Sequence, residues 1–75
     1  MALAYVLINC RLGSAKVVLD ELGQSTEVTE ANAISGAYDI IVKVEASSIE
    51  QVKSAIMKIR RVEGVSSSLT LIKVD

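Results

Sequence analysis

The run from residue 39 to residue 46 constrains the fold of this 75-residue chain most, because its side chains alternate in character with a period of two. Successive side chains of a strand point to opposite faces of a sheet. The pattern predicts a strand from Asp39 to Ala46 whose apolar face is covered by other elements. Its apolar face carries Ile40, Val42 and Val44, and its other face carries Asp39, Ile41, Lys43 and Glu45.

Three further segments are predicted to be strands. Thr26 to Ile34 contains several β-forming residues and is followed by Ser35-Gly36, which indicates a hairpin with the strand that comes next. Ala4 to Cys10 is apolar on both alternating faces, as in a strand covered on both sides. Val65 to Val74 alternates two sets of side chains, which are Ser66, Ser68, Thr70, Ile72 and Val74 against Ser67, Leu69, Leu71 and Lys73.

Two segments between the strands have helical periodicity. Gly13 and Ser14 precede a helix that Gly23 is expected to end as its C′ residue. Ser47 and Glu50 form a capping-box pattern at the start of a second helix. The apolar stripes are Ala15, Val18, Leu19 and Leu22 in the first helix and Ile49, Val52, Ile56 and Ile59 in the second.

The element order β-α-β-β-α-β predicts a ferredoxin-like α+β fold, with a four-stranded antiparallel sheet and two helices on one face of it. We expect residues 1–75 to form one domain. The helices can cover only one face, yet apolar residues are also expected on the other face: Leu7, Ile41, Leu69 and Leu71. A large exposed apolar face needs a partner. We therefore expect dimerisation through the sheets, in a dimeric α/β-barrel-like assembly.

The amino-acid composition excludes several classes of protein and of site. Apolar residues make up 51% of the chain and proline is absent, which excludes disorder. Cys10 is the only cysteine and there is no histidine, so we expect neither an internal disulfide nor a metal site. A net charge of −1 lacks the basic footprint of an autonomous nucleic-acid binder. The apolar start, residues 1–8, has no basic n-region and is too short for a membrane span, and together with the free cysteine this predicts a cytoplasmic protein.

Five segments in a fixed order carry a resemblance to a known family. They are Ala4 to Cys10, the block Gly36-Ala37-Tyr38-Asp39 with the strand as far as Val44, Lys58-Ile59-Arg60, Gly64-Val65, and Ser67-Ser68-Leu69-Thr70-Leu71-Ile72. Along nearly its whole length the chain resembles the ligand-binding domain of the Lrp/AsnC transcription regulators, which is also called the RAM domain. The resemblance implies a dimer built through the sheets, assembly of dimers into rings, and a free amino acid bound as effector between dimers.

Regulators of this family carry an N-terminal helix-turn-helix, whereas this chain starts at the first predicted strand. We therefore expect a stand-alone effector domain that does not bind DNA directly, needs no cofactor, and modulates transcription through partners such as full-length Lrp/AsnC regulators. A purely structural co-assembly module without a small ligand is the main alternative, and a small dimeric α+β barrel enzyme is a second. No phosphate loop, metal spacing or nucleophile motif favours the enzyme, so we expect none.

The predicted ligand site follows from what an amino-acid zwitterion needs, which is an anion for its ammonium group and neutral donors for its carboxylate. Asp39 is the candidate anion. The donors are the backbone amides of Gly36 and Ala37, and Tyr38 would form a wall. The remaining candidate donors are the hydroxyl groups of Ser67, Ser68 and Thr70.

Each of these residues also has a purely structural interpretation. Gly36 can serve only the turn, Asp39 can bond local amides, and Tyr38 can simply pack at the hairpin tip. The β-strand hydroxyls can face solvent. Cys10 is expected to be a small apolar residue, because no base lies nearby to lower its pKa. The basic cluster near the end of the second helix, Lys58, Arg60 and Arg61, is expected to complement the helix dipole.

Overall fold

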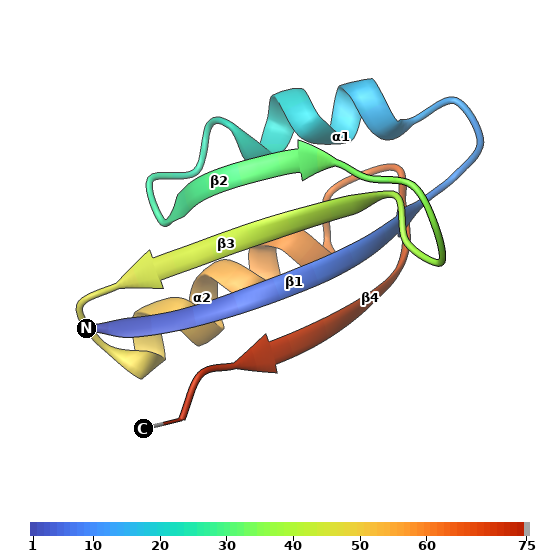
Figure 1. Ribbon diagram of the computed structural model, residues 1–75. Helices are drawn as coiled ribbons and strands as arrows, with labels where there is room; N and C mark the ends of the chain where they lie inside the picture. Colours follow the sequence, from blue (N-terminus) through green and yellow to red (C-terminus); the bar gives the residue numbers. More distant parts are fainter. Residues whose placement is uncertain (75) are drawn as a thin grey trace.

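The computed structural model describes residues 1–74 and has one sheet with two helices on one of its faces (Figure 1). The elements in chain order are β1 Ala2–Cys10, α1 Ala15–Leu22, β2 Val28–Ala33, β3 Ile40–Ala46, α2 Ile49–Arg60 and β4 Val65–Ile72. The antiparallel sheet has the strand order β2-β3-β1-β4. The predicted α+β, ferredoxin-like fold is confirmed.

The core lies between the sheet and the helices. Helix α1 packs on β2, and α2 packs on β1, β3 and β4. The face of β3 predicted to be buried is buried, and its cross-strand partners on β1 share that face. Both helical stripes contribute as predicted. The largest fully covered side chains are Val6, Ile8, Val18, Leu22, Ile40, Val42, Val44, Val52 and Ile59.

Three strand ends differ from the sequence-based predictions. Hydrogen-bonded pairing with the neighbouring strand, rather than residue type, determines where a strand begins and ends. Strand β1 starts at Ala2 rather than Ala4, because Ala2 and Leu3 pair with Ala46 and Glu45. Strand β2 starts only at Val28, after a turn at residues 25–27. Strand β4 ends at Ile72 rather than Val74.

The helix ends differ in two details. Ser48, not Ser47, is the N-cap of α2, and its hydroxyl accepts a hydrogen bond of 3.2 Å from the backbone N–H of Gln51. The predicted cap is therefore wrong by one residue, and the Gln51 Oε1 instead accepts a hydrogen bond of 2.6 Å from the Ser47 hydroxyl. Gly23 caps α1 with φ −65°, so this position does not use the left-handed conformation that favours glycine.

Gly64 lies in the turn between α2 and β4 and needs to be glycine for two reasons. Its φ is 102°, a conformation that other residues rarely adopt. A Cβ there would also lie 2.9 Å from Cγ2 of Val18 and 3.0 Å from Cβ of Ser14. The turn thus packs directly on the start of α1. No helix in residues 1–74 is long and apolar enough to cross a membrane.

Candidate functional site

The candidate site is at the end of the sheet where β1 ends, the β2–β3 hairpin turns and β4 begins (Figure 1). The hairpin connection spans residues 34–39. It is closed by the N–H of Ile34, which donates to the carbonyl of Asp39 at 2.9 Å. Gly36 has φ 130°, with open space where a Cβ would be. Its predicted turn role is confirmed, and backbone conformation rather than crowding is the reason for glycine.

Asp39 connects the hairpin to β1 through both its backbone and its side chain. Its N–H donates to the carbonyl of Ile8 at 2.9 Å, and its Oδ2 accepts from the N–H of Cys10 at 2.8 Å. Ile8 and Ile40 are the last paired residues of the β1–β3 ladder. The carboxylate therefore supplies the acceptor that the backbone of β3 no longer offers to Cys10. The amide that Asp39 bonds belongs to a neighbouring strand, not to its own turn.

The thiol of Cys10 is affected by this arrangement. Burial raises its pKa, and the nearby negative charge of Asp39 raises it further. Both effects disfavour the thiolate, which is the nucleophilic form of cysteine. The expectation that Cys10 is not an activated nucleophile agrees with this environment.

A cavity of about 380 Å³ opens beside Asp39 on the β1–α1 connection. Arg11 is anchored there by its N–H, which donates to the carbonyl of Gly64 at 2.8 Å, while the residue itself is exposed. The lining thus includes one acidic and one basic residue, and among residues 1–74 no ion pair joins the two. Its lining consists of Cys10, Arg11, Leu12, Gly13, Ala15 and Asp39.

Sequence reasoning did not single out Arg11 and Leu12. The available signals were a cation directly after a strand and an apolar residue in a short polar loop, and Leu12 is indeed fully exposed. The predicted hairpin residues Gly36, Ala37 and Tyr38 do not line this cavity. Gly36 and Ala37 are exposed, and Tyr38 is half-buried.

The three predicted hydroxyl donors of β4 do not lie on one face. Ser68 and Thr70 pair with Ile8 and Val6, whose side chains are buried under the helices. Directly paired residues share a face, so these two hydroxyls are on the helix side of the sheet. Ser67 pairs with Asn9 on the opposite face, and the Asn9 Nδ2 donates to its Oγ at 3.4 Å. Of the three predicted hydroxyl donors, only Ser67 therefore lies on the open face, beside Asn9.

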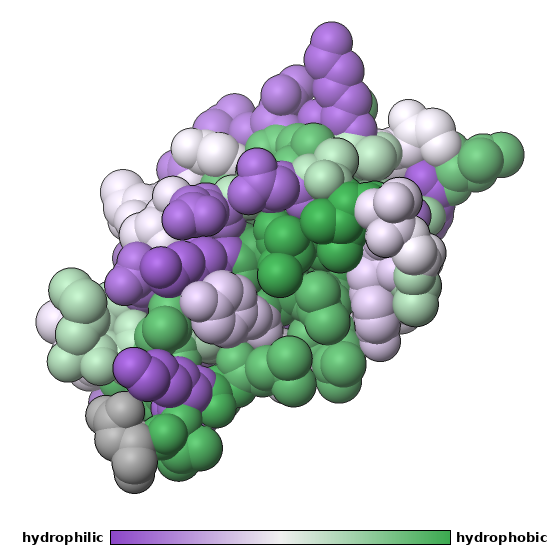
Figure 2. Space-filling view, viewed as in Figure 1, coloured by the Kyte–Doolittle hydropathy of each residue, from purple (hydrophilic) through white to green (hydrophobic). Residues whose placement is uncertain are grey.

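The open face of the sheet, which no helix covers, carries a continuous apolar patch. Figure 2 shows hydrophobic side chains gathered over the middle and lower strands, bordered by a hydrophilic band on the β2 side. On the edge strand β4, Leu69 is 44% exposed and Leu71 is 51% exposed. At its margin the Lys43 Nζ lies 4.0 Å from a carboxylate oxygen of Glu45. We call this surface the open-face patch; its residues are Tyr5, Leu7, Ile41, Leu69 and Leu71.

Nearly the whole sequence matches the model of one protein family. The family model for the Lrp/AsnC ligand binding domain matches residues 3–74. This chain belongs to the Lrp/AsnC ligand-binding domain family. The solved structure of FFRP-DM1 has the same fold, with a TM-score of 0.93 and 32% sequence identity; the match covers 99% of this chain and 100% of that one.

Two curated relatives match the domain to different extents. The HTH-type transcriptional regulator FL11 of Pyrococcus furiosus is 29% identical over 70 residues, a match to 93% of this Lrp/AsnC domain and 46% of the regulator. The chain thus spans about half the length of that relative. A homocitrate synthase of Sulfurisphaera tokodaii is 54% identical over 43 residues, which is 57% of this chain and 9% of the enzyme. So small a part of an enzyme carries no argument for its activity here.

Proposed function

We propose that this Lrp/AsnC domain is a cytoplasmic effector domain that dimerises through its open-face patch and binds a free amino acid where dimers meet. The effector would change how dimers assemble, and partner regulators with a DNA-binding domain would respond to that change. The family supports a role connected with transcription regulation. The amino-acid effector, the assembly and the partner are our proposals.

The observation that carries the proposal is the cavity shared by Asp39 and Arg11. An α-amino acid carries its ammonium group and its carboxylate on the same carbon atom, and a binding site needs a partner for each charge. Asp39 would take the ammonium group and Arg11 the carboxylate. Oδ2 of Asp39 is engaged by Cys10, and no bond to Oδ1 is formed within residues 1–74, so Oδ1 is the atom we assign to the ligand.

The other predicted site residues keep a place in this proposal at the contact between dimers. Gly36, Ala37 and Tyr38 form the tip of the hairpin, next to Asp39. From a neighbouring dimer, the backbone amides of this tip could reach a ligand carboxylate. Ser67 can contribute from the open face. Ser68 and Thr70 are the weakest members of the set, because their hydroxyls lie on the helix side.

The proposal is tested by calorimetric titration of the purified protein with the free amino acids. One of them should bind, and Asp39→Asn should weaken it by roughly thirtyfold or more, since loss of a charged hydrogen-bond partner costs about 2–5 kcal/mol. Arg11→Gln should weaken it as well. Asp20→Asn is the matched control, because Asp20 is an exposed carboxylate on α1 that does not line the cavity beside Asp39.

The alternative is a purely structural module that co-assembles with larger relatives and needs no small ligand. The open-face patch alone would account for it. If no amino acid gives a heat signal at millimolar concentration while the protein still forms dimers, the structural module replaces the sensor.

A further inference from the structure

Leu12 is a fully exposed apolar residue beside the proposed amino-acid site, and it lines the same cavity as Asp39. Single exposed leucines are common on protein surfaces, so its exposure alone indicates nothing. What distinguishes Leu12 is its place in a constrained turn that borders a cavity.

The turn that contains Leu12 is fixed at both ends. The N–H of Ser14 donates to the carbonyl of Arg11 at 3.0 Å, and Gly13 has φ 80°. A turn closed between its first and fourth residues, with a positive φ at its third, has the pattern of a type II turn, and Leu12 is its second residue. The N–H of Arg11 donates to the carbonyl of Gly64 at 2.8 Å, which joins this turn to the one before β4. The fold therefore presents Leu12 from a backbone position that hydrogen bonds fix.

The rest of the cavity lining is uncharged. Among residues 1–74, the lining residues other than Asp39 and Arg11 are Cys10, Leu12, Gly13 and Ala15. Burial and the charge of Asp39 raise the pKa of the Cys10 thiol, so the thiol is neutral at physiological pH and behaves as a small apolar group. A Cβ at Gly13 would meet no atom within 4 Å, so the space next to Leu12 is open.

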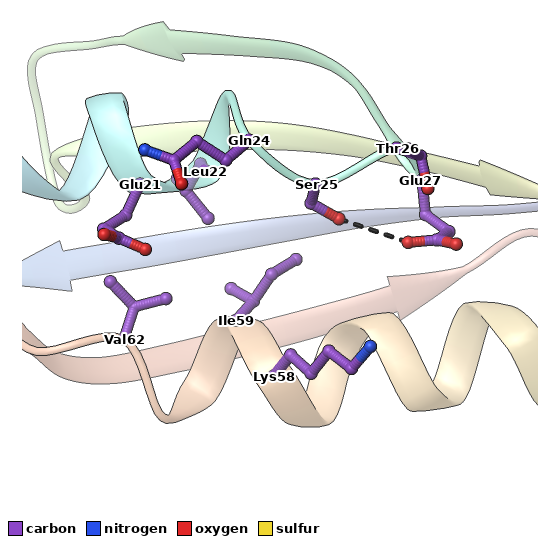
Figure 3. Close-up of a pocket in the computed structure, with 9 residues that line it drawn as sticks. All are labelled: Glu21, Leu22, Gln24, Ser25, Thr26, Glu27, Lys58, Ile59 and Val62. Atoms are coloured by element: carbon purple, nitrogen blue, oxygen red, sulfur yellow. Dashed lines mark hydrogen bonds between the residues drawn. The ribbon is translucent and has the colours of Figure 1, made fainter.

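The groove between α1 and α2 lacks an accessible apolar surface of this kind (Figure 3). Its volume, about 400 Å³, is close to the 380 Å³ of the cavity beside Asp39, but its floor residues Leu22 and Ile59 are only 1% and 2% exposed. A ligand in that groove would cover almost no further apolar area, whereas a ligand beside Leu12 would cover a side chain that is wholly in water. The cavity beside Asp39 is therefore the better site for a ligand with a hydrocarbon part.

We propose that Leu12 determines which amino acid this cavity accepts, and that the effector has an uncharged aliphatic side chain. The inference rests on the proposed function, in which Asp39 takes the ammonium group of the ligand and Arg11 its carboxylate. With both charges used, a charged ligand side chain would lose water without gaining an opposite charge from this lining. An aliphatic side chain would instead cover Leu12, and the affinity would rise with the area covered.

The test is calorimetric titration of the purified protein with alanine, α-aminobutyrate, norvaline and norleucine. These amino acids share their charged groups, and each is longer than the one before it by one methylene. The affinity should rise along the series by up to about fourfold per methylene. Lysine, which is norleucine with an ammonium group at the end of its side chain, should bind roughly tenfold or more weakly than norleucine, and so should glutamate.

Two substitutions separate a role in specificity from a role in positioning the turn. Leu12→Ala should bind alanine nearly as well as the parent does, while the gain in affinity from alanine to norleucine should fall severalfold. Val17→Ala is the matched control, because Val17 is an exposed aliphatic residue on α1 that does not line this cavity. This control should keep the full gain.

The possible failures are distinguishable. An equal loss for alanine and norleucine in Leu12→Ala, no gain along the series in the parent, or tighter binding of lysine or glutamate than of norleucine would each overturn the role of Leu12 and leave amino-acid binding itself standing. If no amino acid binds to the parent, the proposed function is refuted and this inference with it.

Discussion

The carboxylate of Asp39 accepts a hydrogen bond of 2.8 Å from the backbone N–H of Cys10, just beyond the last pair of the ladder between β1 and β3. The same carboxylate is the proposed partner of a ligand ammonium group. Its structural and ligand-binding roles use different oxygen atoms, so substitutions can separate them.

Replacing Asp39 by Ala and by Asn should have different effects on stability. Asp39→Ala leaves the N–H of Cys10 without its acceptor and should lower the free energy of unfolding by about 1–3 kcal/mol. Asp39→Asn keeps an oxygen in place and should cost less than about 1 kcal/mol. Urea denaturation of both variants measures the difference. Equal loss in the two would mean that the negative charge, not the hydrogen bond, stabilises this end of the sheet.

The reactivity of Cys10 reports on the same contact. The negative charge of Asp39 helps to raise the pKa of the thiol, so Asp39→Asn should lower that pKa and increase the thiolate fraction at mildly alkaline pH. Alkylation by iodoacetamide should then be faster in the variant, and the rate against pH should shift toward lower pH. Asp20→Asn should alkylate like the parent. A slower rate in Asp39→Asn would show that the charge does not act on Cys10.

The open-face patch should hold the dimer together. Leu69→Glu places a charge within this patch, next to Leu7, without disturbing the core, because Leu69 points away from the helices. Its expected result is a monomer in light scattering at micromolar concentration, with a far-ultraviolet circular dichroism spectrum like that of the parent. Lys16→Glu, an exposed charge change on α1, should remain oligomeric. A monomeric parent protein would refute the assembly.

Gly64 should tolerate no side chain. Gly64→Ala combines an unfavourable φ with contacts of 2.9 and 3.0 Å to Val18 and Ser14. We expect a loss of roughly 2 kcal/mol or more in the free energy of unfolding. Gly36→Ala is the matched comparison, because its φ is also positive but the space around it is open, so its loss should be smaller. Thermal or urea unfolding of the pair separates crowding from backbone strain.

Much of the fold follows from periodicity alone, whereas the site does not. The alternation around Val42 and the helical stripe through Val52 locate the buried faces, because burial repeats with the period of each element. The N-cap of α2 shows the limit of such patterns. Ser47 and Ser48 are the same residue type, so only the backbone geometry decides that Ser48 caps the helix.

The site is harder to predict because it joins segments that are distant in sequence. The turn pattern indicates Asp39, but its hydrogen-bond partner Cys10 is 29 residues away in sequence, and only the pairing of the strands brings the two together. Arg11, the next residue along the chain, lines the cavity beside Asp39. Conversely, Ser67 and Ser68 are neighbours in sequence, and strand alternation alone assigns them to opposite faces.

The isolated chain should not recognise a DNA sequence. Its net charge is −1, and its basic cluster of Lys58, Arg60 and Arg61 is at the C-terminal end of α2, where it complements the helix dipole. A gel-shift experiment at physiological salt should show no sequence-specific complex. A specific complex that depends on the DNA sequence would contradict this expectation.

The most direct measurement is calorimetric titration of the parent protein and of Asp39→Asn with the amino acid that the parent binds. The account predicts saturable binding to the parent and a loss of roughly thirtyfold or more in Asp39→Asn, with both proteins still dimeric. Binding of equal strength in the two proteins would contradict the assignment of Asp39 to the ligand ammonium. A parent protein that binds no amino acid at millimolar concentration would contradict the effector function itself.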